Sequence, residues 1–127
     1  MDLERLKARA AEIADKETKI LLSKTTASEK LHARAVKSLP SGVASNFQAG
    51  DPYPIYLEKG KASSVFDVDG TEYKDFHGGF GVNVVGHAHP KIVEALTKAA
   101  SNAIHFAVTT TDTIALAEAI CARFHLE

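Results

Sequence analysis

Residues 64–76 read SVFDVDGTEYKDF, and this stretch decides the local fold. Two strand-like runs, 64–68 and 72–76, flank the pair Asp69-Gly70. An Asp-Gly pair in this position predicts a hairpin with a type I′ turn, because that turn needs positive φ at both central residues. Since a third strand-like run, 55–58, comes before the hairpin, we expect a small three-stranded antiparallel meander.

Helical patterns precede the meander. Residues 2–22 carry one narrow apolar stripe at steps of three and four residues, which predicts a charged helix lying across another surface or a solvated arm. The stripe consists of Leu3, Leu6, Ala10, Ile13 and Ile20. Two favourable i,i+4 ion pairs are expected on this helix, Glu12 with Lys16 and Asp15 with Lys19. Thr26 and Glu29 form a capping-box pattern, which predicts a second helix over 27–38.

Residues 39–54 show neither helical nor strand periodicity and contain several prolines and glycines. They predict an extended loop. A loop of this length is unusual in a compact domain, so it is expected to be functional or held in place by other contacts.

Two more helices are predicted after the meander. Pro90 stands at the tolerated first position of one helix, and the other begins within the threonine-rich stretch 109–113. Their expected core residues are Ile92, Val93, Leu96 and Ala100 on the first helix, and Ile114, Ala117, Ile120, Cys121 and Phe124 on the second. An α/β arrangement would continue with a strand after the last helix.

Composition narrows the class of protein. The 127 residues are 45% apolar and 24% charged with a net charge of −1, which is ordinary for one globular domain. Because no basic patch is present, we expect no nucleic-acid partner and no membrane surface. The single cysteine gives no disulfide framework, and the charged N-terminus has no signal-peptide core, so a cytoplasmic location is expected.

A cluster of glycines follows the meander, and three interpretations remain open for it. Gly78, Gly79 and Gly81 could cradle a phosphate, form a wall where backbone approaches a ligand, or serve turn geometry alone. The sequence around them has no G-x-G-x-x-G or Walker pattern, so the phosphate interpretation is the weakest of the three.

Histidines and carboxylates near this cluster do not predict catalysis by themselves. His87 and His89, with His77, lack the spacing of a zinc site, so no metal is expected and a structural role before Pro90 is favoured. The carboxylates Asp67, Asp69, Glu72 and Asp75 do not suggest an acid–base pair. We expect Asp69 to serve the turn and the others to face solvent.

A resemblance to a known family rests on several motifs taken together. The runs that carry it are 66–70, Tyr73, Asp75-Phe76, Gly78-Gly79 and 86–90. In this order and spacing they resemble the class III aminotransferases, which are pyridoxal-phosphate enzymes of fold type I. Residues 39–45 are similar to the glutamate-1-semialdehyde aminomutase branch of that family. The resemblance covers residues 27–127.

This resemblance implies an α/β fold, the N-terminal portion of a fold type I transferase dependent on pyridoxal 5′-phosphate (PLP). Residues 1–38 would be an N-terminal helical arm. Residues 39–88 would comprise a substrate-side loop, the β-meander and the glycine-rich segment. Residues 89–127 would begin the large PLP-binding domain, which this chain does not complete.

The implied activity is transfer of an amino group between an amine or amino acid and a keto acid. The alternatives are an aminomutase that moves the group within one substrate and a non-catalytic remnant that acts as an interaction module. The Schiff-base lysine and the other main cofactor anchors are expected outside this chain, which should therefore be inactive alone. A homodimer or a complementary fragment is the expected assembly.

The resemblance also implies roles for individual residues. Ser45, Gln48 and Phe80 match positions that line the substrate site, and Gly79 and Phe80 would also contact the cofactor. At the position of Gln48 the aminomutase branch has an arginine, which can grip a carboxylate. Glutamine does not supply that charge, so the substrate is expected to differ. No catalytic residue is assigned within the chain.

Overall fold

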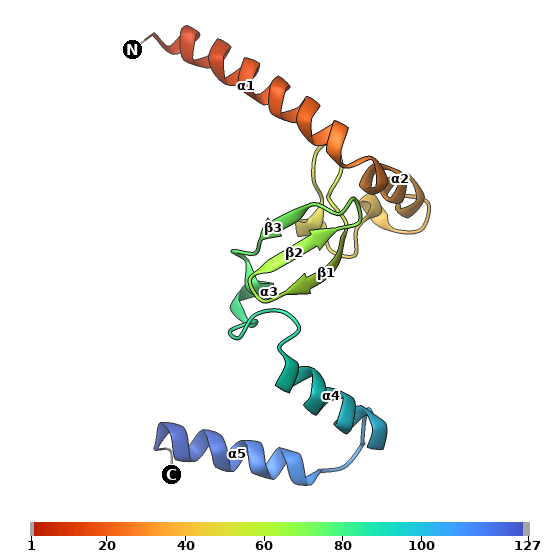
Figure 1. Cartoon of the computed structure of the whole chain (residues 1–127), viewed down its shortest axis with the longest axis vertical. Coiled ribbons are helices and arrows are strands. Elements are labelled where there is room, and N and C mark those ends of the chain that lie inside the picture. Colours follow the sequence, from red (N-terminus) through yellow and green to blue (C-terminus); the bar gives the residue numbers. More distant parts are fainter. Residues whose placement is uncertain (1, 126–127) are drawn as a thin grey trace. The chain divides into compact units, whose positions relative to one another are not determined.

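The computed structural model describes residues 2–125, which fall into two compact units that divide between His89 and Pro90. The first unit is built on a three-stranded antiparallel sheet of β1 (Leu57–Lys61), β2 (Ser64–Asp67) and β3 (Glu72–Lys74), in that spatial order (Figure 1). The predicted meander is confirmed. Its first strand was expected at 55–58 but begins at Leu57, and the register shifts between Leu57 and Lys59.

The turn between β2 and β3 differs from the prediction. Gly70 has a φ of 87°, but Asp69 is absent from the residues with positive φ, so the turn is not type I′. The N–H of Gly70 donates to the carbonyl of Asp67 at 3.0 Å, and the N–H of Asp67 donates to the carbonyl of Thr71 at 3.1 Å. This is a three-residue loop closed by a left-handed glycine.

Asp67 holds this turn, in place of the expected Asp69. Its side chain is only 1% exposed, and Oδ1 accepts from the N–H groups of Asp69 at 3.0 Å and Thr71 at 2.7 Å. Oδ2 accepts from the Tyr73 hydroxyl at 2.8 Å. The expectation that Asp67 faces solvent was therefore wrong, because the turn amides and the Tyr73 hydroxyl satisfy its carboxylate inside the protein.

Two helices precede the sheet, α1 (Leu3–Lys24) and α2 (Thr26–Ala35). The predicted capping box of Thr26 and Glu29 does not form, and α2 ends before the expected Ser38. The carboxylate of Asp69 caps α2 instead, accepting from the N–H groups of Ala27 at 2.6 Å and Ser28 at 3.0 Å. Desolvation raises the pKa of Asp69, but these hydrogen bonds outweigh it and the pKa lies below its usual value.

On α1 the apolar stripe is exposed to solvent in the described chain. The predicted pair of Asp15 and Lys19 forms, with 2.6 Å between Oδ2 and Nζ. Glu12 pairs with Arg9, on the preceding turn, where Lys16 was predicted. Both pairs lie on the surface, where an ion pair contributes little to stability.

The loop between α2 and β1 is held by two tyrosines. It contains two short turns of 3₁₀ helix, η1 (Pro40–Gly42) and η2 (Asn46–Gln48). Tyr53 is 7% exposed and its hydroxyl lies 3.0 Å from Oγ1 of the fully buried Thr25. The Tyr56 hydroxyl donates to the carbonyl of Gly42 at 3.0 Å. These contacts explain how a segment without periodicity keeps one conformation.

The second unit consists of α4 (Pro90–Asn102) and α5 (Thr111–Phe124), joined by a connection that Figure 1 shows as a bend. Both helices begin where they were predicted. Their apolar faces, expected to be buried, are exposed in this chain at every large hydrophobic position from Ile92 to Phe124. No helix within residues 2–125 has the length and apolar character needed to span a bilayer.

Candidate functional site

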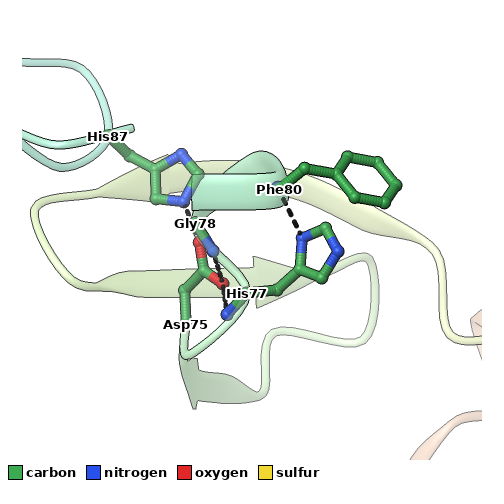
Figure 2. Close-up of polar contacts among 5 residues, drawn as sticks. All are labelled: Asp75, His77, Gly78, Phe80 and His87. Atoms are coloured by element: carbon green, nitrogen blue, oxygen red, sulfur yellow. Dashed lines mark hydrogen bonds and ion pairs between the residues drawn. The ribbon is translucent and has the colours of Figure 1, made fainter. Parts of the chain in front are cut away.

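The carboxylate of Asp75 accepts hydrogen bonds from the first backbone N–H groups of the glycine-rich segment. Oδ1 of Asp75 accepts from the N–H groups of His77 and Gly78, both at 2.9 Å, as Figure 2 shows. The N–H of Asp75 itself donates to the carbonyl of Ser63, at the turn between β1 and β2. The start of the segment is therefore attached to the sheet.

The same carboxylate binds the far end of the segment. Oδ2 of Asp75 lies 2.6 Å from Nε2 of His87. The backbone of His87 pairs with that of Ala62 through two hydrogen bonds of 2.8 and 2.9 Å, again at the β1–β2 turn. Residues 76–86 thus form a loop whose two ends are fixed beside each other.

Two glycines make this closure possible. A Cβ on Gly60 would lie 2.5 Å from Cγ of His87, and a Cβ on Gly86 would lie 2.7 Å from the carbonyl oxygen of Ala62. Real side chains do not approach so closely, so the His87 ring packs directly on the backbone of β1. This packing gives His87 a structural role on the sheet, and its expected role in positioning the helix at Pro90 stays a prediction.

The charge of Asp75 is stabilised by its surroundings. The N–H of Gly78, the His87 ring and the N–H of His77 each bond to the carboxylate and together lower the pKa of Asp75 to about 2. The expectation that Asp75 faces solvent was wrong, since 12% of its side chain is exposed. Asp75 is therefore a structural anion of the loop, and its carboxylate stays charged at neutral pH.

The glycine cluster forms a single left-handed turn, α3 (Gly78–Gly81), in which all four residues have positive φ. Glycine adopts this conformation freely, which explains three of the four positions. Phe80 is the exception, with φ of 62° and ψ of 32°. A bulky residue held there costs on the order of 1–3 kcal/mol, a kind of strain that is concentrated at functional sites.

His77 holds this strained turn in place. Its ring Nδ1 accepts a hydrogen bond of 3.2 Å from the N–H of Phe80, so the imidazole acts as the cap of α3 (Figure 2). Because Nδ1 is the acceptor, the proton of the neutral ring sits on Nε2.

Three aromatic rings meet at this turn. The ring centroids of His77 and Phe80 are 4.5 Å apart in an edge-to-face arrangement, and that of Phe47 lies 5.1 Å from Phe80. Phe47 also stacks on His77 at 6.2 Å with 15° between the ring planes. We call Phe47, His77 and Phe80 the aromatic cluster. Phe47 belongs to η2, so the cluster joins the loop before the sheet to the segment after it.

The predicted site residues divide into two neighbouring groups. Ser45 is the N-cap residue of η2 and Gln48 is the last residue of that turn, and the Ser45 N–H donates to Oε1 of Gln48 at 3.3 Å. Gly79 and Phe80 lie on α3. The two groups come together through the ring contact of Phe47 with Phe80. Contact of any of these four residues with substrate or cofactor stays a prediction.

Phe47 and His77 were missed at the sequence level. Phe47 is next to Gln48 and His77 lies two residues before Gly79, so closeness in sequence was the only available signal. Their mutual contact spans 30 positions of chain and depends on how the loop folds back. Among residues 2–125 no three His, Cys, Asp or Glu side chains gather in a way that could hold a metal ion.

The site and the fold together define a protein family. Residues 46–125 match the family of class III aminotransferases, and the chain belongs to this family. The segment includes η2, the sheet, the glycine-rich turn and both helices of the second unit.

The relatives identify the branch to which the chain is similar. It is 37% identical over 97 residues to glutamate-1-semialdehyde 2,1-aminomutase 2 of Brevibacillus brevis, covering 74% of this chain and 23% of the relative. A solved transaminase with PLP bound is 38% identical, with a TM-score of 0.74, over 78% of this chain and 23% of that one.

A third similarity concerns the fold alone. A glutamate-1-semialdehyde aminomutase from Pseudomonas aeruginosa PAO1 is 21% identical, with a TM-score of 0.83, over 93% of this chain and 26% of that one. The chain thus spans about a quarter of the length of the proteins it matches. It has the fold expected for the N-terminal portion of a fold type I transferase.

Proposed function

We propose that this chain is the substrate-side part of a PLP-dependent aminotransferase that moves an amino group between an amine or amino acid and a keto acid. The observation that carries the proposal is the meeting of η2 with the glycine-rich turn inside the family segment. It supports the proposal because the four residues to which the family resemblance assigns substrate and cofactor roles, Ser45, Gln48, Gly79 and Phe80, lie on or next to these two elements.

The residues present fit an edge contact with the cofactor. Gly79 has no side chain and Phe80 is 74% exposed, so a bare backbone and an open ring are available to a flat pyridine ring. When bound, PLP supplies an electron sink for bond breaking next to the amine. This chain would contribute packing and orientation, and the Schiff-base lysine would come from another part of the complete protein.

An aminomutase reaction is the second candidate, because several relatives bear that name. Gln48 argues for the aminotransferase, since a neutral amide replaces the arginine expected for a substrate carboxylate. A non-catalytic interaction module is the third candidate. It predicts that no amino transfer occurs in any complete form of the protein.

We also propose that the exposed apolar faces of α1, α4 and α5 are covered in the complete protein, by the rest of its fold and by a second subunit. Isolated large hydrophobic residues on a surface are normal, whereas continuous apolar helix faces mark contacts. A homodimer of the complete protein follows from this proposal.

The test replaces the matched segment of the Brevibacillus brevis relative with this chain. We expect the purified chimera to bind PLP and to transfer an amino group from an amine to a keto acid. Isomerisation of glutamate-1-semialdehyde without any keto acid would favour the aminomutase. A chimera that folds and binds PLP but transfers from no amine would contradict the proposal. Supplying the chain in trans to the truncated relative gives a second route if the fusion does not fold.

A further inference from the structure

We propose that Tyr56 is a positioning residue for substrate binding. Its hydroxyl holds residues 40–49, which we call the substrate-side loop, in place through the backbone carbonyl of Gly42. This inference rests on the proposed function, in which Ser45 and Gln48 of this loop contact the substrate. Tyr56 itself touches neither substrate nor cofactor and acts on binding only through the backbone of the loop.

The backbone of Tyr56 is fixed by two other elements. Its N–H donates to Oγ of Ser28 at 3.3 Å, and Ser28 is fully buried near the start of α2. The Ser28 hydroxyl in turn donates to Oδ2 of Asp69 at 2.9 Å. The carbonyl of Tyr56 accepts from the N–H of Val68, just after β2, at 2.9 Å. Both backbone polar groups of Tyr56 are therefore satisfied, and its side chain extends from a fixed point between α2 and the sheet.

The side chain of Tyr56 connects this fixed point to the substrate-side loop. Its hydroxyl donates to the carbonyl of Gly42 at 3.0 Å. Within residues 2–125, no other hydrogen bond joins the substrate-side loop to α2 or to the sheet. The remaining hydrogen bonds of the loop close its own short turns, as between the N–H of Gln48 and the carbonyl of Ser45 at 2.9 Å. One hydroxyl thus provides the polar attachment of the loop.

This attachment is made where the backbone of the loop is strained. Ser41 has φ of 53° and ψ of 18°, a left-handed conformation that is uncommon for a residue with a Cβ, and Gly42 follows with φ of 68°. A Cβ on Gly42 would lie 2.7 Å from Nδ1 of His32 on α2. Strained residues persist where surrounding contacts determine their conformation, and they are concentrated at functional sites. Here the His32 ring and the Tyr56 hydroxyl are those contacts.

The path from Gly42 to the predicted substrate residues is short. Val43 and Ser45 are both extended, with φ of −134° and −142°, so a displacement of Gly42 is passed along the chain to Ser45. The N–H of Ser45 donates to the side chain of Gln48 at 3.3 Å. We therefore expect a shift of the Gly42 carbonyl to move Ser45 and Gln48 together.

Two tyrosines before β1 provide a matched pair of variants. Tyr56→Phe removes the hydroxyl that binds the substrate-side loop and keeps the ring. Tyr53→Phe removes the same group three residues earlier, but the Tyr53 hydroxyl contacts Oγ1 of Thr25, between α1 and α2, at 3.0 Å. If both hydroxyls only stabilise the fold, the two variants behave alike. If Tyr56 positions the substrate-side loop, they differ.

The first experiment follows the loop in the chain by NMR. In Tyr56→Phe the backbone amide signals of residues 41–48 should move toward their values in an unfolded peptide. In Tyr53→Phe the same signals should keep their positions. Equal displacement in both variants, or no displacement in Tyr56→Phe, would overturn the proposal.

The second experiment measures the kinetics of the chimera with butylamine or β-alanine as the amine and 2-oxoglutarate as the acceptor. Tyr56→Phe should raise the KM for the amine about two- to tenfold, the range that one hydrogen bond supplies, and leave kcat and the Kd for PLP unchanged. Tyr53→Phe should leave all three values unchanged. A merely structural role of Tyr56 would reduce the folded fraction, and with it kcat, at constant KM. That result would overturn the proposal and leave the aminotransferase intact.

A third variant displaces the loop independently of Tyr56. Gly42→Ala adds a Cβ 2.7 Å from the His32 ring, so it should raise the KM for the amine at least as far as Tyr56→Phe does. Gly50→Ala is its control, because that Cβ would meet nothing closer than 3.4 Å. An unchanged KM in Gly42→Ala would contradict the positioning role. If the folded chimera transfers from no amine, the proposed function fails, and the NMR comparison still decides whether Tyr56 holds the loop.

Discussion

Asp75 and His87 stand at the two ends of the glycine-rich segment, and their side chains meet with 2.6 Å between Oδ2 and Nε2. The contact closes residues 76–86 into a loop on the β1–β2 turn. This contact fixes the two ends of the loop, whereas the His77 ring binds the Phe80 N–H within the loop. Both contacts restrict the position of Phe80, so we expect substitutions at either contact to change the conformation of the candidate site.

The first prediction concerns acid. The pKa of Asp75 is about 2 in the folded chain, below its ordinary value of 3.8, so the carboxylate stabilises the folded loop above pH ~4. This stability is lost as the pH falls from about 4 through about 2, where the folded carboxyl takes up its proton. The amide signals of His77 and Gly78 should move in that window by NMR.

Asp75→Asn is the matched control for the acid titration. The amide side chain still accepts hydrogen bonds through its oxygen but does not titrate. The two amide signals should then stay constant between pH 4 and pH 2. If they move as far in the variant as in the unsubstituted chain, other carboxylates such as Asp69 and Glu72 cause the change, because their pKa values are lowered as well.

The second prediction concerns the close packing of His87 on β1. Gly60→Ala places a Cβ 2.5 Å from Cγ of His87, so the ring must move away from Asp75. Overpacking of this kind costs typically about 1–3 kcal/mol in the free energy of unfolding. Gly50→Ala is the control, since its Cβ would meet nothing closer than 3.4 Å. Urea denaturation that gives equal values for both variants would show that His87 is not held there.

The third prediction concerns the buried tyrosine of the loop before the sheet. The Thr25 hydroxyl donates to the carbonyl of Leu21 at 2.8 Å, so the Tyr53 hydroxyl must be the donor in its 3.0 Å contact with Thr25. Tyr53→Phe removes this bond while Thr25 keeps its other partner. We expect a loss of about 0.5–1.5 kcal/mol in the free energy of unfolding.

Tyr53→Ala tests the same residue for packing. Removal of the whole ring from a buried position should cost about 3–5 kcal/mol, well above the value for Tyr53→Phe. Thermal or urea unfolding measures both. Similar losses in the two variants would mean that the ring itself contributes nothing and that the loop is held elsewhere.

The fourth prediction concerns substrate charge. In the chimera, Gln48→Arg should improve kcat/KM about tenfold for substrates with a carboxylate at this end. Hydrogen bonds to charged groups contribute about 1.5–3 kcal/mol, and a tenfold change needs ~1.4 kcal/mol. Arginine also removes the Gln48–Ser45 bond. Gln48→Met removes that bond without adding charge and should show no such gain. An unchanged ratio between substrates with and without the carboxylate would mean that position 48 does not face the substrate.

Several features could be predicted from the sequence because they depend on neighbouring residues. The apolar repeat of α1, the start of α4 at Pro90 and the threonines before α5 are local signals, and the helices appear where these signals stand. The family motifs between residues 66 and 90 were equally local, and they identified the aminotransferase family correctly.

Other features depended on residues that are distant in sequence. Asp69 caps a helix 41 residues before it, and Tyr53 bonds to a threonine 28 residues away. The local patterns favoured a capping box at Thr26 and a type I′ turn at Asp69, and the distant contact between the Asp69 carboxylate and α2 prevailed over both. The charged carboxylate of Asp69 accepts from two backbone N–H groups at the start of α2. A neutral threonine hydroxyl there would form weaker hydrogen bonds and would interact less favourably with the helix dipole.

The sequence by itself determined that the meander and the helices α1, α2, α4 and α5 form, though not all of their bounds, and to which family the chain belongs, because periodicity, proline and glycine act over a few residues. Only the tertiary structure decided that Phe47 meets His77 and Phe80, and that Asp75 binds both ends of one loop. Each of these contacts joins residues that are distant in sequence, and no local sequence pattern predicts which residues will meet. Their formation depends on the balance of loop entropy against all the contacts made at once.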